Sequence, residues 1–213
     1  MNNLQDCQLC PRLTTYREEL KQQYPDYHCA PVVAMGYPGA TLFIVGLAPG
    51  LHGANASGRP FTGDASGDLL FAALHRYGFA SQSNSRSLDS EQQLIDCRIT
   101  NAVKCVPPQN KPLSLEINTC NQFLRAEIQQ LPSSSVVLTL GSIAHRAVIR
   151  ALGLQQSAFP FRHGGQYPLQ NEEGSNIQQL FTSYHPSRYN VNTGKITAAS
   201  FARVFASIRE VLS

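Results

Sequence analysis

Side chains capable of chemistry gather in one glycine-rich stretch between Gly46 and Asp64. The stretch contains a histidine, an arginine, an aromatic ring and a carboxylate, at His52, Arg59, Phe61 and Asp64. It follows an apolar run at 41–45 and precedes a helix-like run at 68–75. It therefore leaves the carboxyl end of a strand, where open α/β sheets bind ligands. A carboxylate in such a loop can stabilise a developing cation or orient a water molecule.

A second polar loop follows another strand-like run. It reads Ser-Tyr-His-Pro-Ser-Arg over 183–188, and His185 can donate a hydrogen bond to an oxygen that gains negative charge. Because both loops follow strands, they can converge at one rim of a sheet. Each residue also has a plainer interpretation. Asp64 can cap the helix that follows it, which is compatible with catalysis, and His185 can be a hydrogen-bonded turn histidine.

Four of the six cysteines have the pattern of a metal site. Cys7 and Cys10 form a Cys-x2-Cys pair, and Cys105 and Cys120 lie far along the chain with fourteen residues between them. Four thiolates select zinc or an iron–sulfur cluster. The wide second spacing fits a zinc ribbon poorly, but spacing alone leaves both metals open. Cys97 is expected to be a buried apolar residue, and Cys29 has no assigned role.

The order of elements predicts an α/β fold. Strand-like runs cover 41–48, 98–103, 135–140 and 178–183, and helical patterns cover 67–76, 114–130, 142–152 and 196–212. Strands that alternate with helices form a mainly parallel sheet, so we expect a three-layer α/β/α domain around a four-stranded sheet. Ser114 is expected to cap one helix, Gly153 to end another, and the serine-rich stretch 81–90 to be a surface loop.

Length and composition favour one globular domain over residues 1–213, with an N-terminal segment that carries the first cysteine pair. The net charge of +3 is only mildly basic. The basic excess lies late, with seven Lys or Arg against three acidic residues from Gly141 onward, where it can meet phosphates. A solvated surface explains that excess equally well. No apolar run is long enough for a membrane span and no secretory signal is seen, so we expect a cytoplasmic, nucleoid-associated protein.

The two loops together resemble the uracil-DNA glycosylase superfamily. Gly-Leu-Ala-Pro-Gly at 46–50 and Gly-Arg-Pro-Phe-Thr-Gly-Asp at 58–64 resemble the first motif of family 5, and His-Pro-Ser at 185–187 resembles the third. The resemblance runs from Cys7 to about Thr197. It implies the three-layer fold, hydrolysis of the bond between uracil and deoxyribose, and a 4Fe–4S cluster on the four cysteines. Leu47 stands where family 4 has a glutamate, which favours family 5 and gives Asp64 more importance.

The resemblance also implies roles for the site residues. Asp64 acts on the sugar and His185 on the base, while Phe61 stacks on the base and Asn101 reads its edge. For Phe61 a core aromatic, and for Asn101 an ordinary strand-end residue, remain open, and Asn110 is a weaker second reader of the base. The other residues expected to line the pocket are Gly46, Ala48, His52 and Asn55, and for His52 and Asn55 a role at the loop surface remains equally open.

The loop after His-Pro-Ser is expected to bind DNA through Arg188, Tyr189, Asn190 and Lys195, as a wedge that fills the gap left by a flipped base. Lys111 is a further candidate for phosphate contact. The expected partner is double-stranded DNA that contains uracil or another deaminated base such as hypoxanthine or xanthine, bound by a monomer. The rival hypotheses are a family 4 enzyme, a non-catalytic iron–sulfur protein that binds nucleic acid, and a hydrolase of small nucleosides. A phosphate-binding Gly-x4-Gly-Lys motif is absent from the sequence, which argues against nucleoside triphosphate chemistry.

Overall fold

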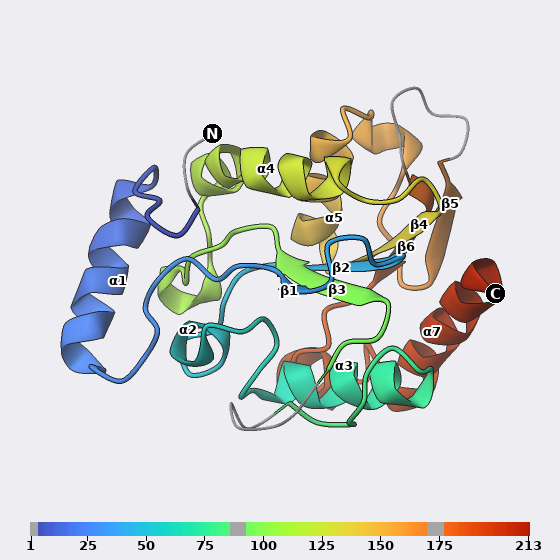
Figure 1. Ribbon diagram of the computed structural model, residues 1–213, viewed down its shortest axis with the longest axis horizontal. Coiled ribbons are helices and arrows are strands. Elements are labelled where there is room, and N and C mark those ends of the chain that lie inside the picture. Colours follow the sequence, from blue (N-terminus) through green and yellow to red (C-terminus); the bar gives the residue numbers. More distant parts are fainter. Residues whose placement is uncertain (1–3, 86–92, 170–176) are drawn as a thin grey trace.

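The computed structural model describes residues 4–85, 93–169 and 177–213, which contain a six-stranded sheet in the order β1-β3-β2-β4-β6-β5 (Figure 1). Strands β3, β2, β4 and β6 run parallel, and β1 and β5 pair antiparallel at the two edges. The bounds are β1 Met35–Gly36, β2 Leu42–Gly46, β3 Cys97–Asn101, β4 Ser135–Leu140, β5 Gly165–Pro168 and β6 Ile177–Ser183.

The central strands are apolar along their whole length because both faces of the sheet are covered. Every residue of β2 and β4 is buried, and the two strands pair in register from Leu42 with Val136 onward. A strand covered on both faces needs a continuous apolar run, not an alternating one. The edge strand β5 ends in Pro168. Proline has no backbone N–H to donate to a neighbouring strand, so sheets tolerate it at their edges.

Two pairs of helices form the outer layers. On one face, α3 (Ala65–Arg76) and α7 (Ala198–Leu212) pack against the sheet, and on the other lie α4 (Ser114–Gln129) and α5 (Ser142–Ala151) (Figure 1). The first face is filled by large aromatic side chains such as Phe71 and Phe205, both fully buried. This arrangement confirms the expected α/β/α fold class.

Helix α1 (Pro11–Gln23) lies to one side of the sheet (Figure 1). Pro11 occupies its first turn, where a missing amide hydrogen costs nothing. Its buried Leu13 and Leu20 pack against Val103 and Val106 of the segment that follows β3. The remaining short elements are the helices α2 (Ala54–Ser57) and α6 (Arg188–Asn192) and the 3-10 turns η1 (Pro108–Asn110) and η2 (Gln156–Ala158).

The structure corrects three details expected from the sequence. The sheet has two more strands than the four expected, because the edge strands β1 and β5 are too short or too polar to give a signal. Helix α1 was not expected, because its residues are largely polar. Ser114 does not cap α4. Leu113 is the N-cap residue, and its amide donates to the Glu116 carboxylate at 2.7 Å.

Other expectations are confirmed or fall outside the described residues. Gly153 follows α5 with φ +75°, as a C′ glycine should. Of the serine-rich stretch, residues 86–90 lie outside the described part, and Ser85 is buried, its hydroxyl 2.8 Å from that of Thr62. Among the helices of the described ranges, none combines the length and apolarity that crossing a bilayer requires.

A buried ion pair ties the segment after β3 to α4. Lys104 is fully buried, and its Nζ donates to the Glu127 carboxylate at 2.7 Å and also to the hydroxyl of Thr100. Because the Lys104 ammonium group is removed from water, the Glu127 carboxylate is the negative charge that compensates for its burial.

Glu127→Gln should therefore lower the free energy of unfolding by about 3–5 kcal/mol, because it leaves the Lys104 charge buried without a counter-charge. Urea denaturation checks this, with Glu19→Gln on the exposed side of α1 as the matched control. Equal unfolding midpoints for the two variants would show that Lys104 needs no partner.

Candidate active site

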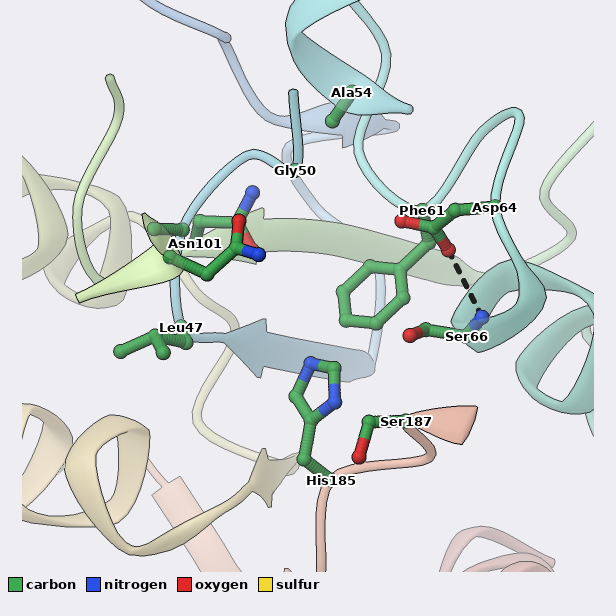
Figure 2. Close-up of a pocket in the computed structure, with 11 residues that line it drawn as sticks. Leu47, Gly50, Ala54, Phe61, Asp64, Ser66, Asn101, His185 and Ser187 are labelled. Atoms are coloured by element: carbon green, nitrogen blue, oxygen red, sulfur yellow. Dashed lines mark hydrogen bonds between the residues drawn. The ribbon is translucent and has the colours of Figure 1, made fainter. Parts of the chain in front are cut away.

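A cavity of about 350 Å³ lies at the carboxyl ends of the parallel strands (Figure 2). Residues that follow β2, end β3 and follow β6 form its walls, as expected for loops that leave one edge of a parallel sheet. The cavity is lined by Leu47, Ala48, Gly50, Ala54, Phe61, Asp64, Ser66, Asn101, Asn110, His185 and Ser187.

The Asp64 carboxylate serves two purposes at once. As N-cap of α3, its Oδ1 accepts hydrogen bonds from the amides of Ser66 and Gly67, at 2.9 and 3.0 Å. Its Oδ2 lies beside Gly53, where an added Cβ would come within 2.7 Å. One oxygen thus caps the helix while the carboxylate still borders the cavity, so the capping interpretation is confirmed without excluding a catalytic one.

Phe61 is held in an unusual backbone conformation with φ +53°. Its carbonyl oxygen would lie 2.1 Å from a Cβ on Gly67, so only glycine fits there. The ring is 6% exposed and lies 5.7 Å from the His185 imidazole, with 26° between the two planes. Figure 2 shows the two rings pointing towards one another inside the cavity. Phe61 is therefore both packed against the core and placed where a flat base can stack.

His185 follows β6 and points into the cavity (Figure 2). Burial lowers the pKa of His185 to about 4, although the negative charge of Asp64 acts to raise it. Its backbone carbonyl accepts a hydrogen bond from Nδ2 of Asn190 at 2.9 Å, which fixes the loop. The imidazole is consequently neutral near pH 7 and can donate one hydrogen bond.

Asn101 ends β3 and lies opposite Asp64 across the cavity (Figure 2). It is 3% exposed, and a Cβ on Gly46 would come within 2.5 Å of its Oδ1 and 2.7 Å of the Phe61 ring. Gly46 thus leaves room for both side chains. Asn110 also lines the cavity, so the structure brings together both amides named from the sequence.

Three residues expected to line the pocket do not do so, and Gly46, which lies against the Asn101 and Phe61 side chains, is the first of them. His52 is exposed, with Nδ1 3.0 Å from the Tyr27 hydroxyl, and connects the glycine-rich loop to the segment after α1. Asn55 is fully buried and its Nδ2 donates to Sγ of Cys29 at 3.5 Å, so it holds the loop from behind. The sequence alone does not show which residues of this loop face the cavity and which face away from it. Gly50, Ala54, Ser66 and Ser187 were missed, although all four lie in or next to the quoted motifs.

The residues expected to contact DNA divide into two kinds. Arg188 and Tyr189 are exposed at the start of α6, and Nζ of Lys195 lies 5.6 Å from the Tyr189 ring centroid. These three form an exposed cluster next to Ser187 on the cavity wall. Asn190 is half-buried and engaged with the His185 loop, so it has a positioning role instead.

The four cysteines named from the sequence line one small apolar cavity, between the N-terminal segment and the start of α4. Burial raises the pKa of Cys105 to about 12 and that of Cys120 to about 11. Within the described ranges, no three His, Cys, Asp or Glu side chains are arranged as a ready metal site. The convergence of four thiols from three distant segments nevertheless fits a tetrathiolate centre. Cys29 and Cys97 are buried outside this cavity.

Comparisons with known proteins identify the family. The model of the uracil-DNA glycosylase superfamily matches residues 33–209. A type-5 uracil-DNA glycosylase of Thermus thermophilus is 40% identical over 99% of this chain and 96% of its own length. The chain belongs to family 5 of the uracil-DNA glycosylase superfamily.

Further relatives separate family 5 from family 4. A type-5 enzyme of Pyrobaculum aerophilum is 40% identical over 96% of this chain and 88% of its own length. A type-4 enzyme of Sulfurisphaera tokodaii is 32% identical over 79% of this chain and 70% of its own length. The higher identity and coverage of the family 5 relatives agree with Leu47, which stands in the cavity wall where family 4 was expected to carry a glutamate.

The His185 ring should titrate far below the ordinary histidine pKa of about 6.5. Between that value and about 4, the unfolded state binds a proton that the folded state does not. Folding stability should therefore fall as the pH drops through this window. Two-dimensional NMR of imidazole-labelled protein measures the titration, with His185→Gln to assign the signal. A His185 midpoint near pH 6.5 would contradict the burial argument.

Proposed function

We propose that this protein removes uracil from double-stranded DNA, as a monomer, by hydrolysing the bond between the base and C1′ and leaving an abasic site. The observation that supports this most directly is the arrangement of one cavity. The anionic Asp64 and the neutral His185 border the same space, with the Phe61 ring between them (Figure 2). The names of the relatives, type-5 uracil-DNA glycosylases, agree with this chemistry.

Asp64 acts on the sugar. As the base leaves, C1′ gains positive charge and resembles an oxocarbenium ion. The carboxylate favours that charge and orients the attacking water, while its cap bonds to the amides of Ser66 and Gly67 hold it in place. Leu47 borders the same space but cannot accept a proton. Asp64 is therefore the residue that has to orient the attacking water.

His185 acts on the base. Uracil leaves as an anion, and a hydrogen-bond donor at its carbonyl oxygen stabilises the developing charge. A neutral imidazole supplies such a donor, and burial keeps His185 neutral. The Asn101 amide offers one donor and one acceptor to the edge of the base, and Phe61 stacks on its face. A cavity of about 350 Å³ accommodates one flipped base.

The exposed cluster of Arg188, Tyr189 and Lys195 engages the duplex. Extruding a nucleotide breaks its stacking and pairing, at a cost of a few kcal/mol. An aromatic ring and two cations next to the cavity can fill the vacated stack and contact phosphates. Lys111, which is exposed and follows Asn110 of the cavity wall, is a further candidate for a phosphate contact.

Cys7, Cys10, Cys105 and Cys120 hold a 4Fe–4S cluster in this proposal. The cluster supplies a structural cross-link among the N-terminal segment, the segment after β3 and helix α4. Every step of base removal is carried by side chains of the other cavity.

The direct test incubates purified protein with duplex oligonucleotides that contain one uracil, hypoxanthine or xanthine, followed by alkali and strand-length analysis. We expect breaks at uracil, and breaks at hypoxanthine or xanthine would extend the substrate range to other deaminated bases. Binding of all duplexes without alkali-sensitive sites would instead support the rival hypothesis of a non-catalytic nucleic-acid binder.

Asp64→Asn and His185→Ala should each lower single-turnover cleavage by about 10²–10⁴-fold, because both groups act where charge develops. DNA binding should change far less. Asn at position 64 keeps the shape of the side chain and can still cap α3, so the variant isolates the charge. Full cleavage by Asp64→Asn at the wild-type melting temperature would remove Asp64 from the mechanism.

Arg188→Ala should weaken binding to a uracil-containing duplex more than binding to single-stranded DNA, since only the duplex has a stack to open. Fluorescence anisotropy at fixed salt measures both affinities. Arg150→Ala, on an exposed part of α5, serves as the control cation. Equal losses on the two substrates would indicate phosphate contact without a wedge.

Protein purified without oxygen should be brown and contain iron and sulfide, because four thiolates converge with no histidine among them. Cys105→Ser should lose the visible absorption, while Cys29→Ser should keep it. If the purified protein contained stoichiometric zinc and no iron, the four cysteines would form a zinc site and the cluster assignment would be wrong.

A further inference from the structure

Within the described residues, Arg17 is a buried cation that forms no ion pair. The side chain lies in α1 and is only 8% exposed. One guanidinium nitrogen, Nη2, donates to the backbone carbonyl of Cys7 at 2.9 Å and lies 3.5 Å from the hydroxyl of Thr14. Its Nε–H is buried and has no acceptor in the described part of the chain. A buried charge of this kind is costly unless something negative lies next to it.

No carboxylate among the described residues pairs with Arg17. The neighbouring arginine of the same helix, Arg12, is bound to Glu116 at 2.7 Å. The other buried cation of this region, Lys104, is neutralised by Glu127. Arg17 is thus the exception among these three, although Asp6 and Glu18 line the same hollow as its side chain.

The four-cysteine cavity is next to Arg17. Cys7 and Thr14, the two partners of the guanidinium, both line that cavity. Arg17 is close enough for its charge to act on Cys10 and Cys105. A second donor already faces the site, since the amide of Lys104 donates to Sγ of Cys120 at 3.3 Å. An arginine with a spare donor therefore lies beside four sulfur atoms that become anionic when they bind metal.

We propose that Arg17 is the resident counter-cation of the four-cysteine site, and that its unpartnered Nε–H donates to a sulfur atom of the bound cluster. This inference rests on the proposed 4Fe–4S cluster. A tetrathiolate cluster carries net negative charge, and its reduced form carries more. A fixed positive charge and a hydrogen bond to sulfur both stabilise the reduced form. Arg17 therefore raises the reduction potential of the cluster and helps the protein to retain the cluster.

The test compares the midpoint reduction potential of four iron-loaded proteins by EPR-monitored titration: the wild type, Arg17→Gln, Arg17→Lys and Lys21→Gln. Lys21 is one turn further along α1 but exposed, so it is the matched control for loss of a positive charge. We expect Arg17→Gln to have a more negative potential than the wild type. Arg17→Lys, which keeps the charge but lacks the Nε donor, should lie between them, and Lys21→Gln should match the wild type.

Unchanged potential in Arg17→Gln, or an equal shift in Lys21→Gln, would overturn the proposal. If Arg17→Gln folds by circular dichroism but does not retain iron, Arg17→Lys decides. Iron retention by Arg17→Lys supports a role for the charge, and loss of iron from that variant as well would overturn the proposal that Arg17 acts as the counter-cation. Failure of the cofactor assignment is distinguishable, because the wild-type protein would then contain zinc and show no reduction wave.

Discussion

The Asp64 carboxylate caps a helix and borders the cavity at the same time, and the glycine-rich loop leaves the space that both contacts need. Oδ1 caps α3, so the carboxylate cannot rotate freely. Space for Oδ2 exists only because Gly53 has no side chain. Gly67 also has no side chain, which leaves room for the backbone carbonyl of Phe61. Phe61 can therefore adopt φ +53°, and its ring enters the cavity. The length and glycine content of the loop follow from these close approaches.

The sheet supplies the second half of the site. Because β2, β3, β4 and β6 are parallel, their carboxyl ends share one edge, and Asn101 and His185 reach the cavity from strands far apart in sequence. Burial at this edge keeps His185 uncharged. In the proposed mechanism, His185 is a neutral donor to the base and Asp64 is an anion near the sugar, which complements the charges that form when a glycosidic bond breaks.

The sequence predicted the parts of this arrangement that depend on local pattern. Continuous apolar runs predicted the four parallel strands, and the two motifs contain Asp64, Phe61 and His185, which the structure brings together at one cavity. It did not predict β1, which has two residues and pairs with β3 far along the chain, or β5, which is short and largely polar. Nor did it separate the cavity side of the loop from its outer side, so His52 and Asn55 were misplaced. The environment of Arg17 depends on tertiary packing, and no local pattern marks a missing counter-charge.

The central claim is that Oδ2 of Asp64 must be free to face the sugar, and two glycines allow a direct measurement. An added Cβ at Gly53 would lie 2.7 Å from Oδ2, whereas one at Gly50 would lie at an ordinary 3.4 Å. Single-turnover excision of uracil from a duplex, at saturating enzyme, should therefore fall steeply in Gly53→Ala and far less in Gly50→Ala. Equal rates in the two variants, with both proteins folded, would contradict the account.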